Sequence, residues 1–374
     1  MLRPRTALAV VAAGALAVSV LHGRADGATT FTRPAPAYHV VYRVESGAVT
    51  SNEELWVDRP FESDEITYAS DGDAAHPSLH VVSRLGRQYV AYGGAPNVIE
   101  TGPQPAQFDQ RLDVVAADAP KGSVALRSGR TVAGRHCRVV RTRGVLAADF
   151  VGTPTVDDHV DSCVTADGIV LAQTTVSDGR TTSTKTATRV AVGAAAVRHH
   201  VFATPGTHLA RAQGGGRIVT VSDDSRPPRA DFWELPAAPA GFKHLGRFAV
   251  VAPSPPTPAT PSSNAPPAPV VTSIADVFVR GADAIVVEQG ETLTSTAIAP
   301  QEGRAVDLGR IGHGRVLVSP IGSSVAALTK SRAGFVRVTG TVPPSQLVAV
   351  ARALRAQPGG SLTVVTDLTS DGAA

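Results

Sequence analysis

The sequence predicts an α+β protein built mainly of short antiparallel strands, with few helices. Its 374 residues are 43% hydrophobic, and the apolar positions are mostly Val and Ala. Val favours strands because its branched Cβ packs well on a pleated surface. Short segments of alternating polarity, separated by turn residues, run from residue 38 to residue 202, and this pattern is typical of half-buried strands. The clearest amphipathic helix comes late, over residues 343–355. A chain of this length can form two domains with ordinary cores.

The first half of the chain is expected to form a series of strands joined by tight turns. Asp167-Gly168 and Asp178-Gly179 are strong turn signals that join three long strands into an antiparallel meander. One face of this meander must be buried. Residues 181–188 are almost wholly polar, which predicts an edge strand or a solvated rim. A helix is expected over residues 106–117, ended by Pro120. The predicted strands cover residues 38–44, 54–57, 65–68, 79–83, 88–92, 123–127, 131–142, 159–164, 169–176 and 182–192.

The N-terminus has the pattern of an export signal. Two arginines in the first five residues precede an apolar run over residues 7–21, which is short for a membrane span of roughly 20 residues. Residues 1–27 are therefore predicted to be a signal peptide, with cleavage near Gly27–Ala28. No Cys follows the run, so this route offers no lipid anchor. An uncleaved anchor is the alternative, and in either case we expect an extracytoplasmic protein of the cell envelope, secreted or tethered.

Cys137 and Cys163 are the two cysteines of the chain. Outside the cytoplasm a lone pair usually forms a disulfide. The closed loop of about 27 residues would contribute roughly 3–4 kcal/mol in the chain-entropy account. A redox pair or a metal site is the alternative, but the spacing has no CxxC, and the neighbouring His136 would point to the opposite face of a strand. The bridge is expected to brace two adjacent strands of the meander.

The second half is expected to form a smaller domain over residues 231–358, preceded by a linker over residues 204–230. Gly214-Gly215-Gly216 and Pro227-Pro228 mark the linker, and a Pro-rich surface loop is predicted at 253–269. Strands are expected at 274–280, 284–289, 315–321 and 335–339, and a loose tail at 359–374. The helix over 343–355 starts with Pro344, where a missing N–H costs nothing. Its apolar stripe consists of Leu347, Val350, Ala351 and Leu354.

Catalytic chemistry has little support in the sequence. The net charge of +3 is small and spread along the chain, so we expect no nucleic-acid partner. Asp157-Asp158-His159 with Asp161 is the densest group of metal-ligand types, but it lacks the spacing of a calcium loop. The glycines at 309, 312 and 314 lack the context of a dinucleotide fingerprint. We therefore expect no cofactor, no metal site and no enzyme activity.

Several short motifs occur along the chain and together span most of it after residue 28. They are Gly134–Arg141 followed by Cys163–Leu171, Phe202–Gly206, Pro239-Ala-Gly241-Phe242, Asp276-Val-Phe278-Val, and Val338-Thr-Gly340-Thr-Val-Pro343-Pro344. These motifs resemble the RseB/MucB family of sigma-factor regulators, and the N-terminal half is similar to the wider group of lipoprotein carriers. The usual opening helix of the family is missing, and the Pro-rich loop falls inside the second domain.

The resemblance implies a curved antiparallel half-barrel over residues 28–203 and a smaller α+β domain after it. It also implies a non-enzymatic sensor that regulates an envelope-stress sigma factor through an anti-sigma partner. Lipid or lipoprotein acyl chains would lie in an apolar groove. Plain core packing is the alternative for each candidate lining residue. A lipid or lipoprotein carrier without signalling is the first alternative function, and a secreted hydrolase using Asp157 or Asp161 is the second. The candidate lining residues are Val81, Val139, Ile169 and Leu171.

Overall fold

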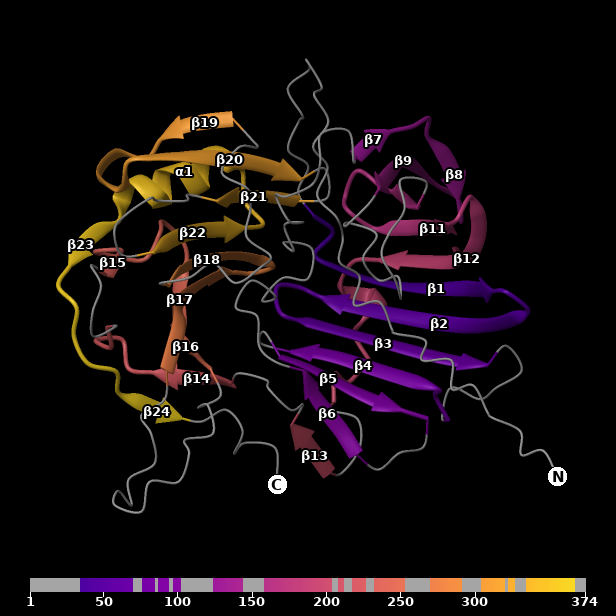
Figure 1. Ribbon diagram of the computed structural model, residues 1–374, viewed down its shortest axis with the longest axis horizontal. Coiled ribbons are helices and arrows are strands. Elements are labelled where there is room, and N and C mark those ends of the chain that lie inside the picture. Colours follow the sequence, from indigo (N-terminus) through magenta and orange to yellow (C-terminus); the bar gives the residue numbers. More distant parts are fainter. Residues whose placement is uncertain are drawn as a thin grey trace.

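The computed structural model describes two large, mainly antiparallel sheets that lie side by side (Figure 1). The residues described are 34–69, 76–84, 87–93, 97–101, 124–143, 158–203, 208–211, 217–226, 232–252, 270–290, 304–319, 322–326 and 334–366. Strands between residues 37 and 211 form the first sheet, and strands between residues 217 and 366 form the second. The fold class predicted from the alternating pattern is confirmed, because strands dominate and a long α-helix appears once within these ranges.

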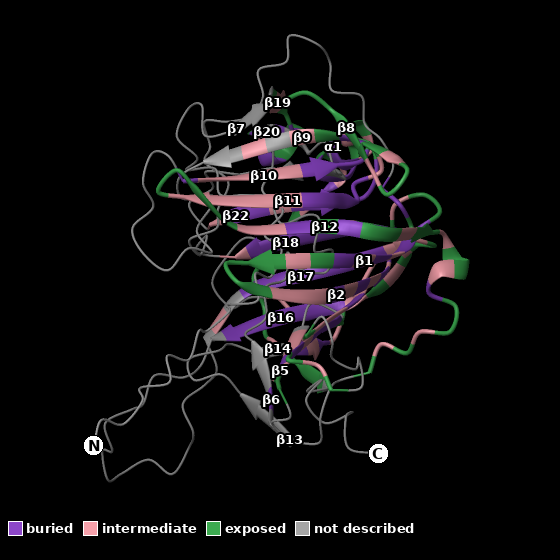
Figure 2. Ribbon diagram, turned by 90° about the vertical axis from the view of Figure 1, so that its right-hand side faces the viewer, coloured by how far each residue is buried: buried purple, intermediate pink, exposed green. Residues whose placement is uncertain are grey.

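The first sheet has 13 strands in the order β13-β6-β5-β4-β3-β2-β1-β12-β11-β10-β9-β7, with β8 paired to β9 (Figure 2). It is open, because its two end strands do not pair with each other, and Figure 1 shows that it is curved. All pairs are antiparallel except β13 with β6. The strands are β1 (Ala37–Ser46), β2 (Val49–Asp58), β3 (Glu62–Ala69), β4 (Leu79–Arg84), β5 (Arg87–Tyr92), β6 (Asn97–Thr101), β7 (Val124–Leu126), β8 (Arg130–Val132), β9 (Arg135–Arg143), β10 (His159–Val164), β11 (Val170–Ser177), β12 (Arg180–Val192) and β13 (His208–Arg211).

The predicted meander is β10-β11-β12, and its tight turns are confirmed. Asp178-Gly179 is a two-residue turn between β11 and β12, with φ of +50° and +71°. Asp167-Gly168 lies in a longer turn between β10 and β11, where Gly168 has φ of +83° and the Thr165 N–H donates to the carbonyl oxygen of Ile169 at 2.9 Å. After β12 the chain forms the short 3-10 helix η4 (Ala194–Ala196) and then leaves the middle of the sheet. It must cross β1 to β6 before β13 can pair with β6 at the far edge.

The second sheet has nine strands in the order β19-β20-β21-β22-β18-β17-β16-β14-β24, and a separate pair joins β15 to β23. The strands predicted at 274–280 and 284–289 are confirmed, and they form the antiparallel hairpin of β17 and β18. The elements are β14 (Arg217–Val221), β15 (Phe232–Glu234), β16 (Lys243–Ala252), β17 (Val270–Arg280), β18 (Asp283–Gly290), β19 (Arg304–Asp307), the 3-10 helix η5 (Gly309–Ile311), β20 (His313–Ser319), β21 (Gly322–Ala326), β22 (Phe335–Gly340), α1 (Pro344–Ala353), β23 (Arg355–Gln357) and β24 (Val364–Thr366).

Helix α1 packs against strands β20, β21 and β22 of the second sheet. It begins at Pro344, as expected, and its predicted apolar stripe lies in the same core as Phe278, Ile285 and Val338. Gly340 lets the helix approach, because a Cβ at this position would lie 2.6 Å from the carbonyl oxygen of Ala284 and 2.9 Å from Leu347 Cδ2. The glycine of the motif before Pro343-Pro344 is thus explained by packing.

Strands occupy two segments for which we expected no regular structure. Strands β13 and β14 lie within the predicted linker 204–230, and β24 lies within the predicted loose tail 359–374. Strand β12 lies between β1 and β11, so the expectation of an edge strand over residues 181–188 was wrong. The predicted signal peptide 1–27, the helix over 106–117 and the loop at 253–269 lie outside the described residues. The domain boundaries remain predictions.

Cys137 and Cys163 form the expected disulfide between β9 and β10, with a Cα–Cα distance of 5.3 Å. Both residues are almost fully buried in the core of the first sheet. The bridge lies within a sheet that already has a large apolar core, and it therefore braces two neighbouring strands.

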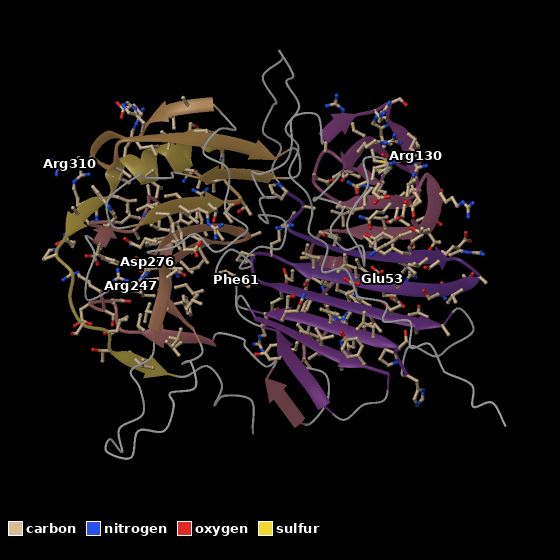
Figure 3. The ribbon with its side chains drawn as sticks, viewed as in Figure 1. Glu53, Phe61, Arg130, Arg247, Asp276 and Arg310 are labelled. Atoms are coloured by element: carbon tan, nitrogen blue, oxygen red, sulfur yellow. A yellow bond between two sulfur atoms is a disulfide. The ribbon has the colours of Figure 1, made fainter. Side chains whose placement is uncertain are left out.

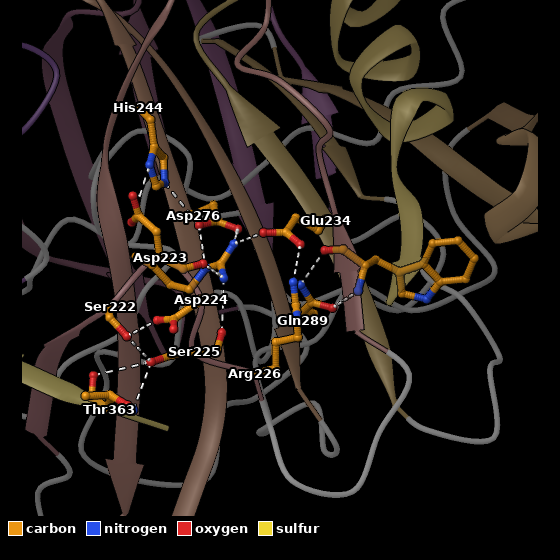
Figure 4. A network of polar contacts seen from close by, with 12 residues as sticks. Ser222, Asp223, Asp224, Ser225, Arg226, Glu234, His244, Asp276, Gln289 and Thr363 are labelled. Carbon is orange, nitrogen blue, oxygen red and sulfur yellow. Dashed lines mark hydrogen bonds and ion pairs between the residues drawn. The ribbon is translucent and has the colours of Figure 1, made fainter. Parts of the chain in front are cut away.

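A network of polar contacts in the second half of the chain centres on Arg247, and Figure 4 shows its partners Ser225, Glu234 and Asp276. Arg247 on β16 is 3% exposed, and it donates from Nε and Nη2 to the two carboxylate oxygens of Asp276 at 2.8 and 3.0 Å. The guanidinium also donates to Glu234 Oε1 at 3.0 Å and to the carbonyl oxygen of Ser225 at 3.0 Å. The Ser225 hydroxyl in turn accepts from the backbone N–H of Thr363 at 2.9 Å. This network ties β15 and the segments beside β14 and β24 to the centre of the sheet.

The substitution Arg247→Met is expected to lower the free energy of unfolding by about 3–5 kcal/mol, because it leaves the Asp276 carboxylate buried without its partner. Urea unfolding at neutral pH measures the loss. The control Arg43→Met removes an exposed ion pair to Glu45 and is expected to cost less than about 1 kcal/mol. Equal effects of the two substitutions would contradict the role assigned to Arg247.

Candidate functional site

The candidate groove residues lie in two places on the first sheet. Ile169 and Leu171 have no exposed surface, and Val139 packs against the same core. Val81 lies in a separate cluster with Leu79 and Val90. The structure thus brings three of the four candidates together, as members or neighbours of a closed core, and places Val81 apart. A role of any of them in ligand binding remains a prediction.

A polar cluster lies on the face of the sheet that carries this core. We call Tyr42, Glu53, Glu65 and Lys185 the inner polar cluster. Lys185 on β12 lies over the ring of Tyr42, with its Nζ 4.3 Å from the ring centroid, and pairs with the Glu53 carboxylate on β2. The Tyr42 hydroxyl donates to the carbonyl oxygen of Val170 at 2.7 Å. Glu53 and Lys185 are 6% and 8% exposed, so this ion pair is buried. Figure 3 shows Glu53 among the strands of the first sheet.

A β-bulge turns Lys185 toward this face. Val40 pairs with Val190, and Val41 pairs with Arg189, but the register shifts before Tyr42, which pairs with Ala187. Without the shift, alternation would place Thr188 and Thr186 beside the core. With it, Ala187 and Lys185 face inward, since a bulge changes which side chains face each side of a sheet. A bulge leaves no clear signal in a polar segment, which explains why sequence reasoning missed Lys185.

Glu65 on β3 separates two apolar clusters on the same face. It lies opposite Leu55 of β2 in one direction and opposite Val81 of β4 in the other, and these two residues belong to different clusters. Within the described residues, the Glu65 carboxyl group makes no hydrogen bond. Burial, reinforced by the charge of Glu53 and opposed by Lys185, raises the pKa of Glu65 to about 8. The carboxyl group is therefore mostly protonated at neutral pH.

The opposite face of the sheet carries an outer histidine cluster, which consists of His39, Trp56, Asp64, His80 and His200. The indole of Trp56 is stacked between the two imidazoles of His39 and His200, with ring centroids 4.4 and 4.1 Å apart. The Asp64 carboxylate binds His80 through one oxygen at 2.7 Å and His200 through the other at 2.8 Å. These contacts hold the segment that follows η4 against strands β2 and β3.

The groups of the outer histidine cluster are partnered. Burial favours the protonated form of Asp64, but the hydrogen bonds from His200 and His80 outweigh it and lower the pKa of the carboxyl group. Burial lowers the pKa of His39 and outweighs its hydrogen bond to Glu54, which measures 2.9 Å. Among the described residues, no His, Cys, Asp or Glu side chains are grouped as a metal ion would require. The cluster therefore has the character of a structural contact.

The acidic residues proposed for a hydrolase are not arranged for catalysis where the structure describes them. Asp157 lies outside the described residues. Asp158 is buried and accepts the backbone N–H of Asp178 at 2.9 Å, which stabilises the turn between β11 and β12. Asp161 accepts two hydrogen bonds of 2.6 Å from Arg141. Burial works to raise the pKa of Asp161, but Arg141 outweighs it and lowers the pKa, so this carboxylate stays ionised.

Known proteins resemble the chain only remotely. No family profile matches the sequence, and no curated protein matches it. Among solved structures, a MucB complex with MucA(peri) is 16% identical over 87% of this chain and 94% of that chain, with a TM-score of 0.31. The MucA/MucB complex of Pseudomonas aeruginosa is 18% identical over 86% and 94%, with a TM-score of 0.29.

A LolA superfamily protein from Nitrosomonas europaea is 8% identical over 44% of this chain and 89% of that chain, with a TM-score of 0.19. Similarities this weak do not assign the chain to a family. Within the described ranges, no helix is long and apolar enough to cross a bilayer.

The raised pKa of Glu65 predicts a pH-dependent stability. The pKa of Glu65 in the folded protein, about 8, exceeds the unfolded value of about 4.3. Its contribution to the free energy of unfolding is therefore complete below pH of about 4.3 and is lost as the pH rises through 8. Glu65→Gln is therefore expected to stabilise the protein increasingly from pH 5 to pH 8. Urea unfolding across this range measures the difference. Glu45→Gln, at an exposed position, should change stability by less than about 0.5 kcal/mol at every pH; a flat Glu65→Gln difference would refute the assignment.

Two histidines are expected to change the stability of the protein with pH in opposite directions. The pKa of His39 is lowered in the folded protein. Its contribution to the free energy of unfolding is therefore present above pH of about 6.5 and is lost on acidification. The hydrogen bond to Asp276 outweighs burial and raises the pKa of His244, so its contribution is present below pH of about 6.5 and is lost as the pH rises. Thermal unfolding of His39→Gln and His244→Gln from pH 5 to pH 8 should give differences from wild type with slopes of opposite sign. Slopes of the same sign would contradict this prediction.

Proposed function

We propose that this chain is an exported, non-enzymatic binding protein that holds an apolar or amphipathic ligand on the inner face of its first sheet. The observation that carries the proposal is the position of Glu65, a hydrogen-bonding group without a partner among the described residues, between two apolar clusters. Binding sites for small ligands are mostly apolar with a few polar groups that set orientation. A residue with a strongly shifted pKa on such a face favours binding over plain core packing.

Each member of the inner polar cluster has a distinct role in this proposal. The Glu53–Lys185 pair is internally neutral, and its groups satisfy each other. Glu65, protonated at neutral pH, can donate to or accept from a polar group of the ligand without placing a net charge beside the apolar chain. Leu55 and Val81 on either side would contact the apolar part. Val139, Ile169 and Leu171 would support this face from the neighbouring core.

We further propose that the protein acts as a sensor through an anti-sigma factor partner. The support is the motif resemblance, whose second-domain segments lie on connected elements of one sheet. Pro239–Phe242 forms the turn that opens β16, with Gly241 at φ of +77° and Phe242 in the core. Asp276 on β17 binds Arg247, and Gly340 lies at the approach of α1 to the sheet. A pull-down from envelope extract that recovers neither a lipid nor a membrane-bound regulator would overturn the sensor role.

Carriage without signalling is the alternative, and it shares the ligand-binding face. Native mass spectrometry of the purified protein separates the two functions. A stoichiometric bound lipid with no recovered regulator favours carriage, and a recovered regulator favours sensing. The hydrolase alternative loses support because Asp161 is held by Arg141.

Val81→Asp is expected to reduce the affinity for the neutral apolar fluorophore N-phenyl-1-naphthylamine by at least tenfold, because it places a charge on the proposed binding face. Fluorescence titration measures the affinity. Val49→Asp is the matched control, since Val49 is 66% exposed, and it should bind as wild type does. Equal binding by the two variants would remove Val81 from the site.

A second measurement needs no change to the apolar face. Ionisation of Glu65 above pH of about 8 should weaken wild-type binding of the same fluorophore, whereas Glu65→Gln should bind equally from pH 6 to pH 9. If wild type and Glu65→Gln have the same pH profile, Glu65 does not contact the ligand.

A further inference from the structure

The cation of the inner polar cluster is a lysine, in a chain that uses arginine for nearly all of its positive charges. Of its 35 lysines and arginines, four are lysines, at positions 121, 185, 243 and 330. The buried carboxylates Asp276 and Glu288 of the second sheet are both paired with arginine. A guanidinium group is not deprotonated in proteins, whereas an amine can lose a proton and become a nucleophile. Lys185 therefore places a potential nucleophile where those two arginine pairs have none.

Lys185 is held against the carboxylate with which it can react. Its side chain runs from β12 over the ring of Tyr42 on β1 and pairs with Glu53 on β2. Strands β12 and β2 lie on either side of β1, so the pair already spans three strands. Because the nitrogen and the carboxylate are in contact, a bond between Lys185 Nζ and Glu53 Cδ requires no rearrangement of the sheet. Well-oriented groups held in this way can reach effective concentrations of about 10⁵–10⁸ M.

Water has little access to this pair. Both partners are almost fully buried, and Tyr42, which covers the ammonium group, is 1% exposed. Tyr42 also belongs to the apolar core that contains Val40 and Leu55. An amine and a carboxylic acid form an amide with loss of water, so a site that excludes water favours the amide. The amide also replaces two buried charges with a neutral group, which costs less to bury.

Glu65 can carry the protons that such a reaction moves. It lies opposite Leu55, two residues from Glu53 on the same face of β2, and diagonal neighbours on paired strands are within reach of long side chains. Within the described residues its carboxyl group makes no hydrogen bond, whereas the Tyr42 hydroxyl donates to the carbonyl oxygen of Val170. A neutral carboxyl group donates one proton and accepts another, as general acid–base catalysis requires.

The amine must be neutral before it can attack. Burial works to lower the pKa of Lys185, but Glu53 and Glu65 outweigh it and raise the pKa, so solvent does not take the proton. A transfer from Lys185 to Glu53 instead leaves a neutral amine beside a neutral acid. This step removes two buried charges at once, and buried charges are costly.

We propose that Lys185 and Glu53 become joined by an amide bond that the folded sheet forms by itself, with Glu65 as the proton carrier. After the transfer within the pair, the amine attacks Glu53 Cδ. Glu65 gives its proton to the departing hydroxyl group and takes one from the nitrogen. The C–N bond forms, the C–O bond breaks, one water molecule leaves, and Glu65 is again protonated. No oxidant, reductant or other co-reactant is consumed.

The amide bond would lock the strand register that the ion pair selects. This inference does not depend on a ligand, and Glu65 keeps its proton for the role proposed above. The slope with pH predicted for Glu65→Gln is also unchanged, because an amide does not titrate between pH 5 and pH 8. A test of the bond therefore succeeds or fails independently of the fluorophore measurements.

Peptide mapping of the full chain by mass spectrometry, after reduction and digestion with trypsin, tests the proposal. Trypsin does not cut at an acylated lysine, so the bond gives one branched peptide in which residues 44–84 are joined to residues 181–189. This peptide is lighter than the sum of its two parts by one water molecule. Fragmentation of the 44–84 part then assigns the bond to Glu53 or to Glu65.

Wild type is expected to give the branched peptide with the bond at Glu53. Lys185→Arg keeps the positive charge and should give linear peptides alone. Glu65→Gln keeps both ends of the bond and should form it about 10²–10⁴-fold more slowly in a pulse–chase experiment. The matched control Glu62→Gln changes a residue on the opposite face of the same strand, and it should form the bond as fast as wild type does.

The wild-type result is decisive without any variant, since linear peptides alone in the folded protein would overturn the proposal. A bond at Glu65 in place of Glu53 would also overturn it. Equal rates in Glu65→Gln and Glu62→Gln would remove Glu65 as the proton carrier.

Discussion

The buried ion pair between Lys185 and Glu53 fixes how the middle of the first sheet is assembled. Lys185 comes from β12 and Glu53 from β2, and the pair reaches across Tyr42 on the strand between them. A buried ammonium group without its partner destabilises a protein by several kcal/mol. A one-residue slip of either strand would turn one charge to the other face. The register of three strands therefore depends on this contact, and the bulge beside Tyr42 is what makes it possible.

This register gives the two faces of the sheet different chemistry. On the inner face, the paired charges satisfy each other, and Glu65 lies between apolar clusters without such a partner among the described residues. On the outer face, Asp64 binds two histidines, and Trp56 is stacked between His39 and His200. The outer groups hold the chain as it crosses from β12 toward the far edge. Part of the chain therefore packs on the outer face, and the ligand that we propose would lie on the inner face.

Local patterns were enough to predict much of the fold. The stripe of Leu347, Val350, Ala351 and Leu354 predicted α1, and two Asp-Gly pairs predicted the turns of the meander. The disulfide was predicted from cysteine count and compartment. What the sequence could not show depends on contacts between distant residues. Lys185 lies in a run of threonines whose inward face is chosen by a bulge, and Glu65 acquires its shifted pKa from Glu53 and from burial that only the assembled sheet provides.

The carboxyl groups of the two sheets give the hydrolase alternative little support. General acid–base catalysis by a pair of carboxyl groups needs both of them to be able to reach a substrate. The partners of Asp64 and Asp161 instead lower the pKa of both carboxyl groups, and Asp276 is bound by Arg247. Glu65 has no such partner among the described residues, and it lies between two apolar clusters. A mostly protonated carboxyl group on an apolar face can orient a polar group of a ligand without placing a net charge beside an apolar chain, and this is the role that we propose for it.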